Sequence, residues 1–284
     1  MKKFLFLAVS TMVFCWDRIL SFGAKLRGRS LPKRKTVLLY HDVEDAAKAP
    51  FARQMRWLCR YAEAGDFGDL LGPAGKRDRV WVTFDDALTG VFRNAIPILG
   101  QHRVPCVIFI PAGWLGRRPG WKNCSRKERR DSVVATAEVL RQHVGDLVTY
   151  GSHGLQHIAL TEAASSQVAS EIIESKACLE EMLQRPMKLY AFAYGQYTSD
   201  HVDLCRQAGY QAAFAAMPSW REQPLDGFLL GRTSVTPCDG LLEFYLKIRG
   251  AFRWHGQVAH LKRRIVSLFR PTKPSSQANQ CCPQ

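Results

Sequence analysis

Short apolar runs of strand length alternate with helical patterns through most of this chain of 284 residues. The segments between the runs carry apolar residues at the three- and four-residue spacing of a helix face. Alternation of this kind favours a mainly parallel sheet with helical crossovers. The expected strands are 36–40, 80–84, 105–111, 146–150, 189–194, 210–216 and 228–235.

The number of repeats selects among the parallel folds. About seven strands without a glycine-rich dinucleotide-binding motif favour a closed sheet. The sequence therefore predicts an α/β fold, a distorted (β/α) barrel formed as a single domain by residues 36–270, with a polar, disordered tail at 271–284. The expected helices are 51–62, 91–99, which Pro97 is expected to kink or end, 125–144, 168–183, 199–209, 241–255 and 257–270.

Polar side chains of catalytic types lie at or just after the ends of several expected strands. In parallel barrels the carboxyl ends of the strands meet on one face, and the chemistry takes place there. These side chains are therefore expected to converge on a single site. They are His41, Asp85, Asp86, His153, His157 and Tyr194.

The adjacent carboxylates Asp85 and Asp86 need a cation. Two like charges at this distance repel, so one pKa rises unless a positive group lies between them. An isolated Asp-Asp pair is more simply read as a polar turn. Here, however, His153 and His157 follow another apolar run. One carboxylate and two imidazoles suit a catalytic divalent ion that keeps positions open for water and substrate.

These motifs, in this order, resemble those of the polysaccharide deacetylases of carbohydrate esterase family 4, which include chitin, peptidoglycan and nodulation-factor deacetylases. The motifs are Thr83–Asp86, Gly151–His157 and Phe192–Tyr194, and the likeness extends to Leu39–Val43 and to 95–109. It covers roughly residues 36–235. Each motif is weak alone, whereas the ordered set on matching strands is specific.

The resemblance implies a divalent metal ion, zinc first, and hydrolysis of N-acetylated sugars to acetate and a free amino sugar. By position, Asp86, His153 and His157 would ligate the metal. Asp85 would be the general base that takes a proton from the attacking water. The backbone N–H of Tyr194 would help to hold the oxyanion.

The chain departs from the family pattern at several positions. Gly154 replaces the usual serine or threonine after the first histidine. Ala191 stands where an arginine commonly orients the base, and Arg232 is the candidate to replace it. No late Leu-x-His motif supplies a general acid, so His41 is the candidate for that role, with a purely structural role as the alternative.

The net charge of +15, from 40 basic and 25 acidic residues, favours an anionic partner. The excess concentrates at 18–35, 117–130 and 247–273, and a solvated basic surface is the alternative interpretation. An anionic membrane surface is the expected partner beside an N-acetylated glycan substrate. No nucleic acid is expected, because no helix-turn-helix, finger or aromatic RNA-binding motif occurs. The sequence indicates no oligomeric state.

Residues 1–35 are predicted to be a membrane-directed apolar segment and a basic linker. The uncharged run from Phe4 to Trp16 has the length of a signal-peptide core and is short for a membrane span. If it spans, the basic residues after it favour a cytosolic location for the rest of the chain. Location at the cytosolic face of a bacterial inner membrane is thus slightly favoured, with an interfacial helix or export to the periplasm or medium as alternatives.

Nine scattered cysteines, an odd number without C-x-x-C spacing, indicate reduced thiols rather than a disulfide framework. The leading hypothesis is a metal-dependent deacetylase of an N-acetylated sugar in a bacterial envelope glycan or its lipid-linked precursor. Two alternatives remain open, a deformylase acting on a lipid-linked amino sugar and a degenerate member that binds glycan without hydrolysing it. The missing late histidine favours the degenerate member, and the intact acidic and imidazole residues oppose it.

Overall fold

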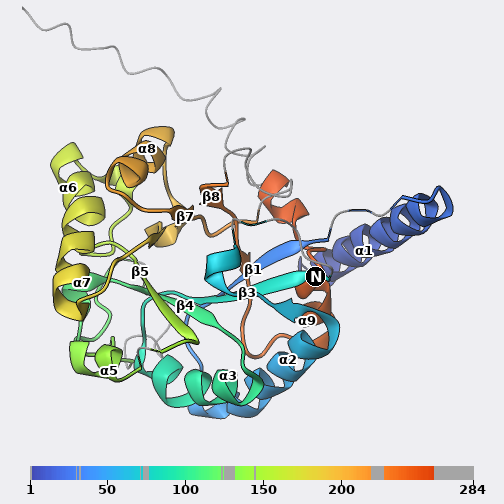
Figure 1. Ribbon diagram of the computed structural model, residues 1–284, viewed down its shortest axis with the longest axis horizontal. Coiled ribbons are helices and arrows are strands. Elements are labelled where there is room, and N and C mark those ends of the chain that lie inside the picture. The colour runs from blue at the N-terminus through green and yellow to red at the C-terminus, as the bar shows by residue number, and fades with distance from the viewer. Residues whose placement is uncertain are drawn as a thin grey trace, which may run out of the picture.

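A curled sheet of parallel strands forms the centre of the computed structural model (Figure 1), which describes residues 2–29, 31, 33–70, 72, 77–122, 124, 132–143, 145–218 and 227–258. The strand order is β8-β7-β6-β5-β4-β3-β1-β9, with β2 beside β3. The strands are β1 (Lys35–Tyr40), β2 (Glu63–Ala64), β3 (Arg79–Phe84), β4 (Cys106–Ile110), β5 (Val148–Ser152), β6 (Leu189–Ala191), β7 (Ala212–Phe214), β8 (Leu229–Leu230) and β9 (Thr233–Ser234).

Helices cover the outside of the sheet, as Figure 1 shows. The α-helices are α1 (Lys2–Leu26), α2 (Lys48–Tyr61), α3 (Ile96–His102), α5 (Ala137–Gln142), α6 (Ser165–Ala169), α7 (Ser175–Leu183), α8 (Ser199–Gln207) and α9 (Leu241–Ile248). Two π-helical turns, η3 (Val91–Ala95) and η6 (Ser170–Glu174), run directly into α3 and α7. Short 3-10 turns are η1 (Asp45–Ala47), η2 (Phe67–Asp69), η4 (Ala112–Trp114), η5 (Leu160–Glu162) and η7 (Ala193–Gly195).

The central strands are mostly apolar because both faces of the sheet are buried. In β3, Val80 and Val82 pack outward with the helices, whereas Trp81 packs inside the curled sheet with Val107 and Phe109 of β4. Every strand pairing is parallel. The predicted distorted barrel is thereby confirmed, and the carboxyl ends of β1, β3, β5 and β6 share one edge.

The predicted strand 228–235 divides into two. β8 pairs with β7, whereas β9 pairs with β1 at the other end of the strand order. Arg232 lies between them, so consecutive residues border both ends of the curled sheet. The short strand β2 was not predicted, because two residues, Glu63–Ala64, are too few to show the alternating pattern of a strand.

Three helix predictions need correction. The helix expected at 241–255 ends at Ile248, and a turn at 249–253 that contains Gly250 with φ 67° follows it. Within the described residues the helix before β5 begins at Thr136, whose hydroxyl accepts a hydrogen bond from Val139 N at 3.3 Å. Pro97 does not end its helix, because it lies in the first turn of α3, where no helical N–H is required. The start expected at 125, residues 259–270 of the last expected helix and the tail lie outside the described residues. The seven described cysteines are free thiols.

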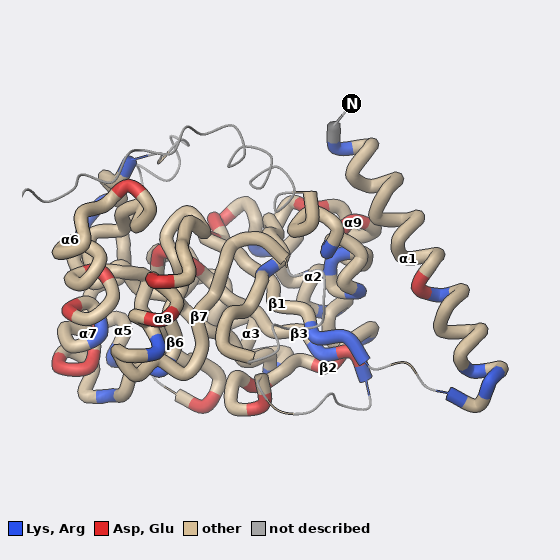
Figure 2. Tube along the Cα trace, turned by 90° about the horizontal axis from the view of Figure 1, so that it is seen from above, with Lys and Arg blue, Asp and Glu red and all other residues tan. Residues whose placement is uncertain are grey.

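The N-terminal helix is longer than the apolar run suggested. α1 continues through Asp17, whose carboxylate pairs with Arg34 at 2.9 Å and with Arg253 at 2.7 Å. Because the two arginines neutralise the Asp17 carboxylate, this charge does not end the helix. The segment from Lys3 to Leu26 is long and apolar enough to cross a membrane, a property that signal sequences share. Figure 2 shows α1 running along one side of the barrel, and the Phe14 ring lies 5.6 Å from Tyr245 of α9.

Candidate metal centre

Two strand ends bring three potential metal ligands together. Asp86 follows β3, and His153 follows β5, at the same edge of the sheet. Asp86 Oδ1 lies 3.2 Å from His157 Nε2 and 3.7 Å from His153 Nε2. One donor atom from each residue lies within 4.8 Å of the others, and all three side chains are buried. Buried charged and polar groups of this kind are either paired with one another or coordinate a metal ion.

The protonation of His153 suits a metal ligand. Its Nδ1 donates a hydrogen bond to the carbonyl of Ala191 at 2.8 Å, which directs the other ring nitrogen toward the carboxylates. Burial lowers the pKa of His153 to about 4, so the imidazole is neutral near pH 7. A neutral imidazole with its lone pair beside a carboxylate is the form that binds a divalent ion. The donor set therefore fits the metal that the sequence predicts.

Asp85 is held by an arginine from the far end of the sheet. Both of its oxygens accept hydrogen bonds from Arg232, at 2.6 and 2.8 Å, and Arg232 Nε donates to Ala215 O at 3.1 Å. Burial would raise the pKa of Asp85, but Arg232 and His153 outweigh it and hold that pKa below its usual value. Asp85 is thus an ionised carboxylate with Oδ2 3.7 Å from His153 Nε2. The contact expected of Arg232 is confirmed.

Strained backbone marks the same place. Asp86, Ala87, His157 and Tyr194 all have positive φ, between 49° and 71°. Each such residue without glycine's freedom costs about 1–3 kcal/mol and persists only where its surroundings enforce it. Clustering of such strain is typical of functional sites.

The loop that carries both histidines is braced by a residue the sequence reasoning missed. Glu171, buried in the π-helical turn η6, accepts hydrogen bonds from Leu155 N at 2.9 Å and Gln156 N at 2.6 Å. Gly154 has φ +85°, and a Cβ there would overlap the Glu171 carboxylate. Gly154 is therefore required here, and Glu171 braces the loop through the two backbone N–H groups. The only signal in the sequence was an acid directly before Ile172, which belongs to the predicted apolar helix face.

Aromatic side chains line this loop. The Trp121 ring stacks on His157 with centroids 4.3 Å apart, and Trp114 Nε1 donates to Gln156 O at 3.1 Å. Tyr197 stacks on Phe192 at 5.0 Å. All these contacts are made within the protein, so the rings pack around the loop.

The two remaining predicted residues also lie at this centre. Tyr194 places its ring 4.8 Å from that of His157, and its hydroxyl donates to the carbonyl of Lys122. His41 follows β1 and is partly buried, and its charge lowers the pKa of both Asp85 and Asp86. All six predicted side chains are thereby brought to one edge of the sheet. Their individual roles remain predictions.

Comparisons with known proteins agree with this architecture. A family model described as polysaccharide deacetylase matches residues 72–213, half of the chain. YxkH of Bacillus subtilis (strain 168) is 22% identical over 217 residues, 72% of this chain and 73% of that protein. A poly-beta-1,6-N-acetyl-D-glucosamine N-deacetylase of Staphylococcus aureus (strain MSSA476) is 24% identical over 60% of each chain. The structure of IcaB from Ammonifex degensii has a TM-score of 0.63 at 23% identity, covering 78% of this chain and 97% of that one.

Proposed function

We propose that this chain, which belongs to the polysaccharide deacetylase family, is a metal-dependent enzyme that removes the acetyl group from an N-acetylated sugar. Membership makes it a hydrolase of carbon–nitrogen amide bonds. The observation that carries the proposal is the buried set Asp86, His153 and His157 beside an ionised, arginine-held Asp85. A degenerate glycan-binding protein has no need to keep an ionised carboxylate buried at this cost.

Each residue has a chemical task. Asp86, His153 and His157 would hold one divalent ion, zinc in the first instance. A bound ion lowers the pKa of a water and polarises the acetamide carbonyl. Asp85 takes the proton of the attacking water, and Arg232 keeps its carboxylate ionised and oriented.

Two further residues complete the reaction. His41, at the end of β1, gives a proton to the leaving amine. The backbone N–H of Tyr194 donates to the developing oxyanion, and the left-handed φ of 57° at this residue fixes its orientation. Together they would convert the amide to acetate and a free amino sugar.

The proposed substrate is an N-acetylated sugar of a bacterial envelope glycan or of its lipid-linked precursor. The staphylococcal relative, named for its action on poly-beta-1,6-N-acetyl-D-glucosamine, makes oligomers of N-acetylglucosamine the first substrates to test. Association of α1 with a bacterial inner membrane, cytosolic face favoured, is the proposed location, and an anionic membrane surface is the proposed second partner. Deformylation of a lipid-linked amino sugar uses the same residues and is the alternative reaction.

The first test is the metal content of the full chain, measured by elemental analysis for the wild type, His153→Ala and Asp85→Asn. About one divalent ion per chain is expected in the wild type and in Asp85→Asn, and none in His153→Ala. Acetate release from N-acetylglucosamine oligomers is expected from the wild type alone. Formate release from an N-formyl sugar, without acetate release, would assign the deformylase reaction instead.

Two outcomes would reject parts of this assignment. Absence of metal from every protein after reconstitution would leave a glycan-binding protein without hydrolysis. Deacetylase activity retained in Asp86→Ala would exclude the metal-dependent mechanism. In the same assay, His41→Ala should keep its metal but lose the alkaline limb of the pH profile, and an unchanged profile would remove His41 as the acid.

A further inference from the structure

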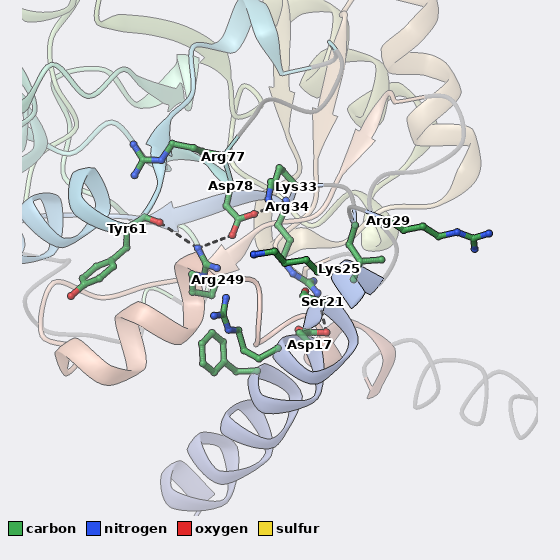
Figure 3. Close-up of a pocket in the computed structure, with 13 residues that line it drawn as sticks. Asp17, Ser21, Lys25, Arg29, Lys33, Arg34, Tyr61, Arg77, Asp78 and Arg249 are labelled. Atoms are coloured by element: carbon green, nitrogen blue, oxygen red, sulfur yellow. Dashed lines mark hydrogen bonds and ion pairs between the residues drawn. The ribbon is translucent and has the colours of Figure 1, made fainter. Parts of the chain in front are cut away.

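A basic cavity lies at the opposite end of the sheet from the metal centre. Figure 3 shows it between α1, the linker after α1 and the amino ends of β1 and β3. Its volume is about 710 Å³. The metal centre uses the carboxyl ends of the strands, so this cavity is no part of the proposed active site. It is called the basal pocket below and is lined by Phe14, Asp17, Arg18, Ser21, Lys25, Arg29, Leu31, Lys33, Arg34, Tyr61, Arg77, Asp78 and Arg249.

Positive charge in the basal pocket exceeds what its own acids neutralise. Asp17 pairs with Arg34 at 2.9 Å, and Asp78 pairs with Arg249 at 2.8 Å. Within the described part of the chain, no carboxylate forms an ion pair with the other cations of the wall. These are Arg18, Lys25, Arg29, Lys33 and Arg77. Five like charges around one cavity repel one another, and an anion bound among them relieves that repulsion.

The helix beside the pocket has two distinct faces. Its inner face is docked on the domain through Ser10, which bonds Trp254 Nε1 at 3.0 Å, and through Asp17. Its outer face carries large apolar side chains that nothing in the described structure covers. Those nearest the pocket are Trp16, Ile19, Phe22 and Leu26, with 61 to 73% of each residue exposed.

Arg18 and Lys25, seven residues apart, lie on one line along α1, at the border between these two faces. Arg29 follows just beyond the end of the helix, and Figure 3 shows its side chain extending outward from the pocket wall. An apolar ridge is therefore bordered by a row of cations that opens into the basal pocket. The complementary molecule has a negative head and an apolar body side by side.

We propose that the basal pocket binds the phosphate of an anionic phospholipid, whose acyl chains lie along the outer face of α1. Charge complementarity and the adjoining apolar ridge select a membrane lipid over a free anion, since a free anion would leave the ridge in water. The proposal is independent of the deacetylase reaction because it uses the other end of the sheet. It gives the membrane association of this chain a specific site.

The test compares binding of the full chain to vesicles of phosphatidylcholine alone and of phosphatidylcholine mixed with phosphatidylglycerol. The wild type is expected to prefer the mixed vesicles. The double variant Arg29→Ala/Lys33→Ala should lose on the order of tenfold or more of its affinity for them, because each basic residue near an anionic surface contributes about fivefold. Its hydrolysis of a soluble substrate should be unchanged.

A matched control separates the pocket from net charge. Arg185→Ala/Lys188→Ala removes the same two charges from exposed positions between α7 and β6. It should keep the preference for mixed vesicles. Equal losses in the two double variants would mean a diffuse charge effect and would overturn the proposal. The proposal would also be overturned if the wild type bound inorganic phosphate as tightly as it binds the mixed vesicles. That result would identify a site for a free anion.

Discussion

The Asp85 carboxylate remains ionised because Arg232 binds both of its oxygens in a buried, charge-assisted pair. The guanidinium also lies 5.2 Å from the centre of the Phe109 ring, which fixes its plane. The arginine therefore tunes the base through charge and through position. Both effects act through direct contact of Arg232 with Asp85, the proposed base.

We expect Arg232→Gln to move the acid limb of kcat/KM to higher pH. Loss of the cation removes the strongest opposition to the burial that raises the pKa of Asp85, so the base stays protonated to a higher pH. Arg232→Lys keeps the positive charge but makes fewer hydrogen bonds to Asp85, so it should shift the acid limb of kcat/KM less. Removing one partner of a buried pair also costs about 3–5 kcal/mol of stability, so folding is checked by circular dichroism. An acid limb identical in the wild type and Arg232→Gln would exclude this role.

At the scale of the element, the loop after β5 depends on a helix that contributes no metal ligand. The helical run from Ser165 to Leu183 widens into the π-turn η6, where Glu171 points at the loop backbone. π-turns of this kind occur frequently at functional sites because they redirect a side chain. Ser175, four residues along, adds a bond to Ser152 of β5 at 2.8 Å. The run from α6 to α7 thereby positions His153 and His157 indirectly.

Glu171→Gln should weaken metal binding about 10- to 100-fold, the usual effect of losing a residue that orients a ligand. The amide can accept from only one side, so one of the two loop N–H groups loses its partner. Competition with a chelator measures the affinity. Glu174→Gln, an exposed change in the same turn, is the control, and equal affinities for the two variants would show that the brace is not needed.

For the molecule as a whole, α1 is docked along the barrel by polar contacts and presents apolar side chains outward. Figure 2 shows the helix beside α9, and the contacts extend from Lys3 with Glu243 to Asp17 with Arg253. Asp17 joins three segments, because it binds the linker residue Arg34 as well. Because the helix is docked in this way, a membrane that contacts its outer apolar face would also reach the basal pocket.

Asp17→Asn should therefore loosen α1 from the barrel. The Asp17 side chain is only 13% exposed, so its two arginine pairs should contribute more than the ~0–1 kcal/mol of an exposed pair. Hydrogen exchange of the full chain is expected to show faster exchange in α1. The control is Asp203→Asn, which removes an exposed acid paired with Arg206. If the amides of α1 exchange as fast in the wild type as in Asp17→Asn, the helix is not docked on the barrel.

The main strands and the edge where they deliver Asp85, Asp86, His153 and His157 were predictable from the chain, whereas β2 and the division of 228–235 into two strands were not. These features follow from local periodicity and from the rule that parallel strands end together. Contacts between distant residues were decided by the tertiary structure. Arg232 contacts Asp85 from 147 residues away in the chain. The stacking of Trp121 on His157, the hydrogen bonds from the loop to Glu171 and the docking of α1 are also long-range contacts, and no periodic pattern in the sequence predicts them. Side chains meet at such places only after the sheet has curled and the helices have packed on it.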